Sequence, residues 1–449
     1  MTSENQRRRW HGRRFAALAF AVLMGTAARA DDWPQWLGPR RDGVWRETGI
    51  LDKFPAGGPK VLWRAPVAAG YSGPAVAQGR VYVTDRVLAP GTALGDPNSR
   101  AKNAPGSERV HCLDAASGRS LWVHEYDCPY TAAYPLGPRT TPVVHEGKVY
   151  TLGTEGNLLC LDARSGQVVW SRDLKKDYQV STPLWGFSAH PLLDGNRLIC
   201  MVGGEGTTVV AFDKDSGKEI WRALTAREPG YCPPMIYDVA GKRQLIIWHA
   251  EAINGLDPET GKVYWSQPVN VFMGMAIATP RKEGDALFLA GVQNQSALLR
   301  LGATKPMAEV VWRGSKERGL SPIFATPYFD GEYIYGNVGD GLLTCIKADT
   351  GERIWETLAP NKNQKVRGGD IFIIKNGNRF FLVTDQGDLI IAGLKPNGYQ
   401  EISRGHLLDT TYTTWNRNIL WSHPAFAQRC VFARNDKEII CVSLAADGS

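Results

Sequence analysis

The chain has 449 residues, of which 43% are hydrophobic and 22% charged, and its formal net charge is +7 at pH 7. Six arginines and one glutamate among residues 1–30 account for five of these charges, which leaves two for the rest of the chain. Nucleic-acid binding needs a concentrated basic surface that neutralises many phosphates, so this charge excludes nucleic acid as a partner.

Residues 1–30 have the three parts of a signal peptide in the required order. The basic leader MTSENQRRRWHGRR precedes the apolar run FAALAFAVLMG, and Ala28-Arg29-Ala30 forms a small-x-small cleavage site. We predict that the mature chain begins at Asp31, is periplasmic or secreted, and retains no transmembrane segment. Arg13-Arg14 leaves both twin-arginine and general export open.

Residues 31–59 carry no repeat and are dense in Trp, Pro and Gly. We expect this N-terminal extension to pack on the outside of the main domain, with Trp33, Trp36 and Trp45 as anchors. An arm that docks a partner is the alternative.

From residue 60 onward the sequence repeats itself. CLDAASGRSLW at 112–122 returns as CLDARSGQVVW at 160–170, and the same Asp, Gly and Trp spacing recurs at 213–221 and 257–265. Each copy contains short β-rich runs separated by Gly turns, which is typical of a four-stranded antiparallel meander. A meander repeated every 40 to 50 residues or so indicates a β-propeller.

Counting the copies predicts an all-β, eight-bladed propeller over residues 60–449, which we expect to be a monomer. The blades are predicted at 73–126, 140–174, 187–224, 232–269, 275–315, 324–358, 368–408 and from 421 onward. The last copy stops before its outer strand, whereas PKVLWRAPV at 59–67 is an outer strand without a blade. We therefore predict that 421–449 and about 60–67 form one closing blade.

The repeated triplet has a structural interpretation. Glycine provides the turn conformation, the Asp side chain accepts hydrogen bonds from the turn backbone, and the Trp lies where neighbouring blades meet. The predicted blade joints are Trp63, Trp122, Trp170, Trp221, Trp265, Trp312 and Trp355.

The cysteines fall into two groups. Cys112, Cys160, Cys345 and Cys441 share a repeat position that favours a small buried side chain. Cys128 and Cys232 lie in predicted loops, so we expect these two to be the reactive or paired ones, although the sequence leaves disulfide pairing open. There is no Cys-x-x-Cys motif, which argues against a zinc site.

The segments LDARSGQVVW and FDKDSGKEIW resemble the tryptophan-docking motif of PQQ-like propellers, a family that includes quinoprotein alcohol dehydrogenases and the lipoprotein of the outer-membrane barrel assembly machine. The resemblance covers residues 60–449. DDWPQWLGPRRDGV, YPLGPRTTPVV and WGFSAHPLL look closer to secreted PQQ-like propeller proteins of planctomycetes. Catalytic and non-catalytic relatives share the repeat, so the resemblance implies fold and compartment rather than activity.

Loops that precede the innermost strands are rich in aromatic and charged residues, and we expect them to meet on one rim around the channel. The predicted ligand- or cofactor-binding residues are Arg139, Trp185, His190, Tyr231, Arg367, Trp415, Arg417 and His423. Cationic and planar groups suit an anionic or aromatic ligand. The alternative is that these side chains bond neighbouring loops and fill the channel.

Two functions follow, and whether the protein is an enzyme stays open. The favoured one is an exported scaffold or binding propeller for a protein partner or small ligand. The other, implied by the resemblance, is a PQQ-dependent dehydrogenase of alcohols or sugars with PQQ and calcium as cofactors. In it Arg139, Arg367 and the aromatic residues of the rim would hold the quinone, and Asp370 is the candidate base because of its position on the predicted rim. The chain lacks the adjacent cysteine pair of those enzymes and a residue-by-residue match to their calcium ligands, and no metal site is identified.

Overall fold

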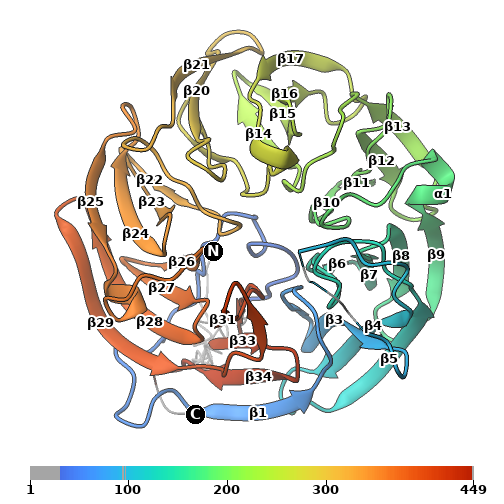
Figure 1. Cartoon of the computed structure of the whole chain (residues 1–449), viewed down its shortest axis with the longest axis horizontal. Coiled ribbons are helices and arrows are strands. Elements are labelled where there is room, and N and C mark those ends of the chain that lie inside the picture. Colours follow the sequence, from blue (N-terminus) through green and yellow to red (C-terminus); the bar gives the residue numbers. More distant parts are fainter. Residues whose placement is uncertain (1–30, 94–95, 97, 447–449) are drawn as a thin grey trace, which may run out of the picture.

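The computed structural model describes residues 31–93, 96 and 98–446. Within them, eight four-stranded antiparallel sheets stand in a ring (Figure 1), which confirms the predicted eight-bladed all-β propeller. The predicted signal peptide at 1–30 lies outside the described residues.

Seven blades are continuous stretches of chain, and in each the first strand is innermost (Figure 1). Blades 1 to 4 consist of β2 (Ala75–Ala77), β3 (Arg80–Leu88), β4 (Gly106–Asp114) and β5 (Ser120–Asp127); β6 (Val143–His145), β7 (Lys148–Leu152), β8 (Asn157–Asp162) and β9 (Val168–Asp173); β10 (Leu192–Asp194), β11 (Arg197–Met201), β12 (Val209–Asp213) and β13 (Glu219–Ala223); and β14 (Met235–Val239), β15 (Lys242–Trp248), β16 (Ala252–Leu256) and β17 (Val263–Pro268).

Blades 5 to 7 follow the same order. They consist of β18 (Arg281–Glu283), β19 (Ala286–Leu289), β20 (Ala297–Leu301) and β21 (Ala308–Arg313); β22 (Tyr328–Asp330), β23 (Tyr333–Val338), β24 (Leu342–Lys347) and β25 (Arg353–Thr357); and β26 (Ile371–Asn376), β27 (Arg379–Thr384), β28 (Asp388–Lys395) and β29 (Gly398–His406).

Blade 8 closes the ring with strands from both ends of the chain. Its order is β32 (Ala425–Ala427), β33 (Cys430–Arg434), β34 (Glu438–Ser443) and β1 (Val61–Pro66), with Trp63 opposite Cys441. The predicted closing blade is thus confirmed. Outside the blades lie α1 (Leu174–Tyr178), η1 (Phe272–Gly274), η2 (Ala359–Asn361) and a small hairpin of β30 (Tyr412–Thr414) and β31 (Arg417–Ile419).

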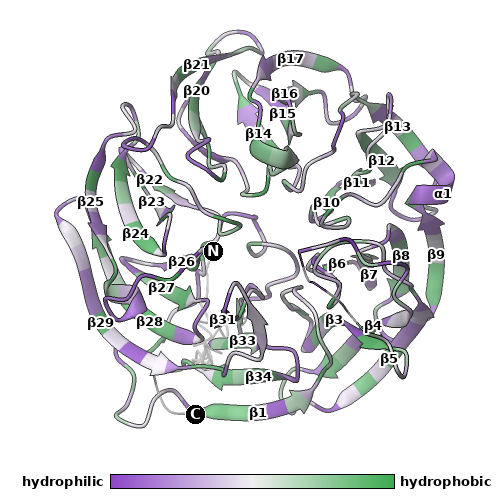
Figure 2. Cartoon of the chain, viewed as in Figure 1, coloured by the Kyte–Doolittle hydropathy of each residue, from purple (hydrophilic) through white to green (hydrophobic). Residues whose placement is uncertain are grey.

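The core consists of apolar residues packed between neighbouring blades. The middle strands are almost entirely buried, as in β8 and β24, because both of their faces meet another blade. The outer strands alternate between less and more exposed positions, as along β25, where half-buried and exposed residues alternate. Hydrophilic and hydrophobic residues both occur along these outer strands (Figure 2). The period-two pattern of the sequence is therefore strongest on the outer strands.

An indole ring joins most neighbouring blades. The Nε1–H of six of the seven predicted joint tryptophans donates to a carbonyl in the outer turn of the next blade, 2.8 to 3.2 Å away; the pairs are Trp63–Ala115, Trp122–Ala163, Trp170–Lys214, Trp221–Pro258, Trp312–Ala348 and Trp355–Lys395. In five of these six joints, all but that of Trp355, the turn glycine lies directly under the ring. A Cβ on Gly217 would come within 2.7 Å of the Trp170 ring.

Two joints depart from this pattern. Trp265 packs in the cluster between blades 4 and 5, but its Nε1–H donates to Gln244 of its own blade at 2.7 Å. Between blades 7 and 8 the tryptophan position is Ile402, and the N-terminal extension fills the joint. The Phe54 amide donates to Ser403 Oγ at 3.0 Å, and Pro59 lies against Gly405.

The rest of the N-terminal extension crosses the ring centre (Figure 1). Trp33 pairs with Val76 of blade 1, the Arg41 side chain donates to the Pro191 carbonyl beside blade 3 at 2.8 Å, and the backbone amide of Trp45 donates to the Lys375 carbonyl of blade 7 at 2.8 Å. The sequence-based expectation placed this segment on the outside of the ring. The inward path could not be predicted, because a segment without a repeat has no pattern that indicates which strands it crosses.

All eight cysteines are unpaired and buried. Cys128 and Cys232, expected to be the reactive or paired ones, lie in loops but are covered by the ring, and burial raises the pKa of both thiols above the ordinary value. A raised pKa disfavours the nucleophilic thiolate, so their environment is that of unreactive thiols.

The joint predicts a specific sensitivity at its glycine. Gly217 has φ +68°, so Gly217→Ala adds both backbone strain and a clash with Trp170. We expect the free energy of unfolding in urea to fall by about 2–4 kcal/mol. Gly241→Ala, at φ +71° with nothing within 4 Å, is the control and should cost about 1 kcal/mol. Equal losses in the two variants would show that the indole does not constrain the turn.

Candidate functional site: a cavity at the ring centre

One face of the propeller carries all the connections between blades. The strands of an antiparallel meander alternate in direction, so the fourth strand ends on the face of the ring where the first strand begins. Each outer strand therefore connects to the next inner strand across that face. The turns between the second and third strands of each blade lie there too. Loops from every blade therefore converge around the central axis on this face, which we call the loop face.

A cavity of about 530 Å³ lies among these loops. Its wall is largely aromatic and aliphatic. The lining residues are Trp36, Tyr71, Gly73, Asn98, Tyr134, Arg139, Leu184, Trp185, Ser188, His190, Tyr231, Pro233, Met273, Met275, Ile277, Val292, Gln293, Ile323, Phe324, Phe372, Trp415, Trp421 and His423. The volume is that of a site for a small molecule.

The repeat places one residue of nearly every blade in this wall. In seven blades a proline precedes or begins the inner strand, and the residue three positions before that proline lines the cavity; these residues are Tyr71, Arg139, Ser188, Tyr231, Ile277, Phe324 and Trp421. Blade 7 has Asp370 in place of the proline, and Arg367, its equivalent residue, is exposed and outside the wall. The fixed register explains why residues so far apart in sequence meet.

Six of the eight ligand-binding residues predicted from the sequence line the cavity: Arg139, Trp185, His190, Tyr231, Trp415 and His423. The other two do not. The Arg367 side chain is exposed, and its backbone carbonyl accepts from Arg417 Nε at 2.8 Å. Arg417 also forms an ion pair with the buried Asp385 at 2.6 Å, so it fastens the rim instead of facing the wall.

Sequence reasoning did not single out several residues of the wall. Tyr134 and Trp421 lie in loops from which other residues were predicted to bind a ligand, and Tyr71 lies in the connection into blade 1. The position three before the proline would have found Tyr71 and Trp421. Trp36 could not be found in this way, because it belongs to the extension.

The extension closes the far end of the cavity. Trp36 stacks on His190 with ring centroids 3.8 Å apart and 12° between the planes, and its Nε1–H donates to Thr279 Oγ1 at 2.9 Å. The Arg41 side chain donates to the backbone carbonyls of His190 and Pro234, in the connections that lead into β10 and β14, and so binds the extension to blades 3 and 4. Burial lowers the pKa of Arg41 to about 10. The cavity therefore has a floor of aromatic rings.

Buried carboxylates hold the loops that form the wall. Glu155 accepts from the amides of Thr131 and Ala132 and from Lys175 Nζ. Glu108 accepts from the hydroxyl of Tyr130 and, at 3.0 Å, from the amide of Thr154. Each carboxylate satisfies several loop donors at once, which fixes the loop without a regular element.

Asp370, the predicted base of the dehydrogenase hypothesis, is one of these anchors. It is buried and absent from the cavity wall, and it accepts from the amides of Ile323, Phe324 and Ala325 at 3.2, 2.7 and 3.0 Å. Burial raises the pKa of Asp370 to about 6, while the bonds from these amides act against the rise. Its geometry is that of a residue that positions a loop of the wall.

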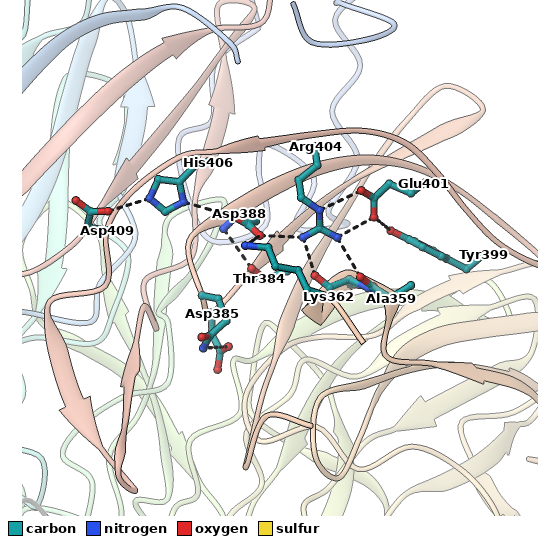
Figure 3. A network of polar contacts seen from close by, with 12 residues as sticks. Ala359, Lys362, Thr384, Asp385, Asp388, Tyr399, Glu401, Arg404, His406 and Asp409 are labelled. Atoms are coloured by element: carbon teal, nitrogen blue, oxygen red, sulfur yellow. Dashed lines mark hydrogen bonds and ion pairs between the residues drawn. The ribbon is translucent and has the colours of Figure 1, made fainter. Parts of the chain in front are cut away.

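A further polar network lies on blade 7 beside the rim (Figure 3). Asp388 accepts from Lys362 at 2.9 Å and Arg404 at 2.8 Å, and His406 Nδ1 lies 3.3 Å away. Burial alone would raise the pKa of Asp388, but these partners lower it below the ordinary value. Arg404 also donates to the Pro360 carbonyl. The network thus holds the loop at η2, and none of its residues lines the cavity.

The anchoring role of Asp370 can be tested by removal. Asp370→Ala leaves three loop amides without their acceptor, so we expect the free energy of unfolding to fall by about 2–4 kcal/mol. Amide hydrogen exchange at 323–325 should become faster. Asp285→Ala, whose side chain is 61% exposed, is the control and should stay within about 0.5 kcal/mol of the parent. Unchanged exchange in Asp370→Ala would show that the loop does not depend on this carboxylate.

Both histidines of the wall are held neutral. Burial lowers the pKa of His190 well below its ordinary value, and the nearby Arg41 charge lowers it further. Burial lowers the pKa of His423 from 6.5 to about 4. The unfolded chain therefore takes up these protons first as the pH falls below 6.5, and the stability that His423 contributes is lost between about pH 6.5 and 4.

His423→Phe should remove part of this acid sensitivity, because phenylalanine keeps the ring packed against Phe372 and cannot take up a proton. Between pH 7 and 4.5 we expect the variant to lose about 2 kcal/mol less free energy of unfolding than the parent. Urea titrations at both pH values measure the difference. His145→Phe, at an exposed histidine, is the control and should follow the parent. Equal acid losses in parent and His423→Phe would contradict a neutral buried His423.

The cavity wall does not fit PQQ with calcium. PQQ is a flat tricarboxylate, and calcium takes oxygen ligands, so the pair needs free cationic donors and carboxylates. Among the described residues Arg139 is the one lysine or arginine of the wall, and no Asp or Glu lines it. No group of three or more His, Cys, Asp or Glu in the described ranges could hold a metal ion.

Comparison with known proteins identifies the family. A model described as outer membrane protein assembly factor BamB, one of the PQQ-like repeats, matches residues 106–308 and 303–449. A search of curated proteins gave no match. In the part of the chain that the structure describes, no helix is long and apolar enough to cross a membrane.

Solved structures share the fold at low identity. BamB from Moraxella catarrhalis has a TM-score of 0.57 at 19% identity, over 86% of this chain and 99% of that chain. Quinohemoprotein alcohol dehydrogenase from Comamonas testosteroni has a TM-score of 0.62 at 13% identity, over 94% and 82%. A europium-containing methanol dehydrogenase has a TM-score of 0.60 at 12% identity, over 92% and 89%.

Proposed function

Since the chain belongs to the PQQ-like propeller family described as outer membrane protein assembly factor BamB, we propose that it is an exported binding protein that takes a small molecule into the cavity of its loop face. The observation that carries the proposal is the cavity itself, walled by loops from around the ring and floored by Trp36. Export rests on the signal peptide expected at residues 1–30.

The geometry favours binding over chemistry. The one carboxylate considered as a base, Asp370, is buried and occupied by three backbone amides. Arg417 is paired with Asp385, and Arg367 lies outside the wall. The charged side chains predicted for the site are therefore engaged in holding the loops or stand apart from the cavity.

A protein partner on the same face is a second candidate. Phe272 and Met273 of η1 are 40% and 53% exposed, and Met273 also lines the cavity. Large exposed apolar side chains beside a cavity are suited to a protein contact. The family description as an assembly factor favours the same idea. A partner on this side would cover the mouth of the cavity.

The test is a thermal-shift screen on the chain isolated from the cell envelope, where its first residue should be Asp31. Neutral aromatic compounds, aromatic acids, and PQQ with calcium are titrated against the parent and against Ile277→Trp, which fills the cavity from its wall. We expect at least one class to raise the melting temperature of the parent in proportion to ligand concentration, and the variant to lose the effect.

Ile220→Trp makes the same substitution on an outer strand, where Ile220 is 41% exposed, and should respond as the parent does. If no compound distinguishes the parent from Ile277→Trp at millimolar concentration, the cavity is not a small-molecule site. The protein partner then becomes the leading candidate.

A further inference from the structure

We propose that the cavity selects an uncharged, flat and largely apolar molecule and discriminates against anions. The inference rests on the proposed function, because it names the ligand class of the same cavity. It follows from the charges of the wall, the state of its histidines and the arrangement of its rings.

Among the described residues, the one Lys or Arg of the wall has no donors to spare on its terminal nitrogens. Arg139 Nη1 donates to Gly137 O at 2.6 Å and Thr154 Oγ1 at 3.1 Å, and Nη2 donates to the carbonyls of Ala133 and Tyr134 at 2.7 Å each. Both terminal nitrogens thus have both of their N–H groups engaged. Bonding an anion through them would require breaking contacts that shape the loop.

Neither histidine supplies a positive charge: its hydrogen bond excludes one on His190, and burial disfavours one on His423. His190 Nδ1 accepts from the Thr141 amide at 2.9 Å, so this nitrogen carries no proton and the ring is neutral. His423 Nδ1 lies 2.8 Å from the Pro424 carbonyl, and the ring is packed between Trp36 and Phe372. An anion entering the cavity would lose its hydration, and Arg139, the cation that it would meet, has its terminal N–H groups committed to the loop.

The wall offers flat apolar surfaces in place of charges. The Trp421 ring lies 5.3 Å from Trp415, 5.3 Å from Phe324 and 5.7 Å from Tyr134, centroid to centroid, and Trp185 lies 5.5 Å from Tyr231. Aromatic rings suit a planar ligand through stacked and edge contacts. Met273 and Met275 add polarisable side chains that adapt to ligand shape.

The test compares two probes that share one ring scaffold. N-phenyl-1-naphthylamine is neutral, and 8-anilinonaphthalene-1-sulfonate adds a single negative charge. Both report an apolar site by fluorescence. We expect the parent chain to bind the neutral probe saturably, one per chain, with a Kd at least tenfold lower than for the sulfonate. Equal or tighter binding of the sulfonate would overturn the inference.

Ile277→Lys places a cation in the wall, and we expect it to weaken the neutral probe at least tenfold and to tighten the sulfonate. Ile220→Lys, on the exposed outer strand, should match the parent for both probes. A melting temperature taken with each titration verifies folding, and Met275→Lys replaces Ile277→Lys if that variant does not fold.

The two proposals fail in different ways. If the wall substitution alters binding but the parent prefers the sulfonate, the cavity is a ligand site and the ligand class is wrong. If Ile277→Lys and Met275→Lys both bind the two probes as the parent does, the probes lie elsewhere, and the cavity loses its standing as a site.

Discussion

An indole ring lying on a glycine turn holds most neighbouring blades of this propeller together. The Trp170 ring covers Gly217 of the next blade, and its Nε1–H donates to Lys214 beside it at 2.9 Å. Both parts are needed, because a side chain on the glycine would displace the ring. A flat ring with one donor satisfies the turn carbonyl and buries apolar area in the same contact. The joints fix each blade, and the blades in turn place the loops at the centre.

The loops themselves depend on buried carboxylates. Loops have amide donors that no strand pairs, and a carboxylate can accept several of them at once. Asp370 does this for residues 323–325, and Glu155 does it for Thr131 and Ala132. Buried carboxylates outside the cavity therefore hold the backbone of the loops that form its wall. The charges of the interior serve the loops, which leaves the wall itself nearly uncharged.

The repeat in the sequence predicted most of the fold. The spacing of Asp, Gly and Trp indicated the blades and their joints, and the orphan strand with Trp63 indicated how the ring closes. The joint at Ile402 was invisible in this way, because the residues that fill it, Phe54 and Pro59, come from a segment without repeats. Trp265 keeps its place in the pattern, but its indole donates to Gln244 of its own blade, a partner that the repeat does not indicate.

The site was predicted less completely than the fold, for a physical reason. Residue type suggested Arg367 and Arg417, whose charges suit a ligand, and position on the predicted rim suggested Asp370 as a base. A charged side chain inside a protein can pair with a ligand or with another group of the same chain. Here Arg417 and Asp370 pair with groups of the chain. Position in the repeat is the better guide, because the residue three before the proline lines the cavity in seven blades. That rule would have named Tyr71 and Trp421 without any argument from charge.

The N-terminal extension links the integrity of the ring to that of the cavity. Phe54 fills the joint between blades 7 and 8, while Trp36 forms the floor against His190. Both residues belong to one segment that also pairs with blades 1, 3 and 7. A ligand on the floor would contact the same segment that completes the ring. Binding would therefore stabilise the closed ring by mass action, and loosening the extension would weaken both the joint and the floor of the cavity.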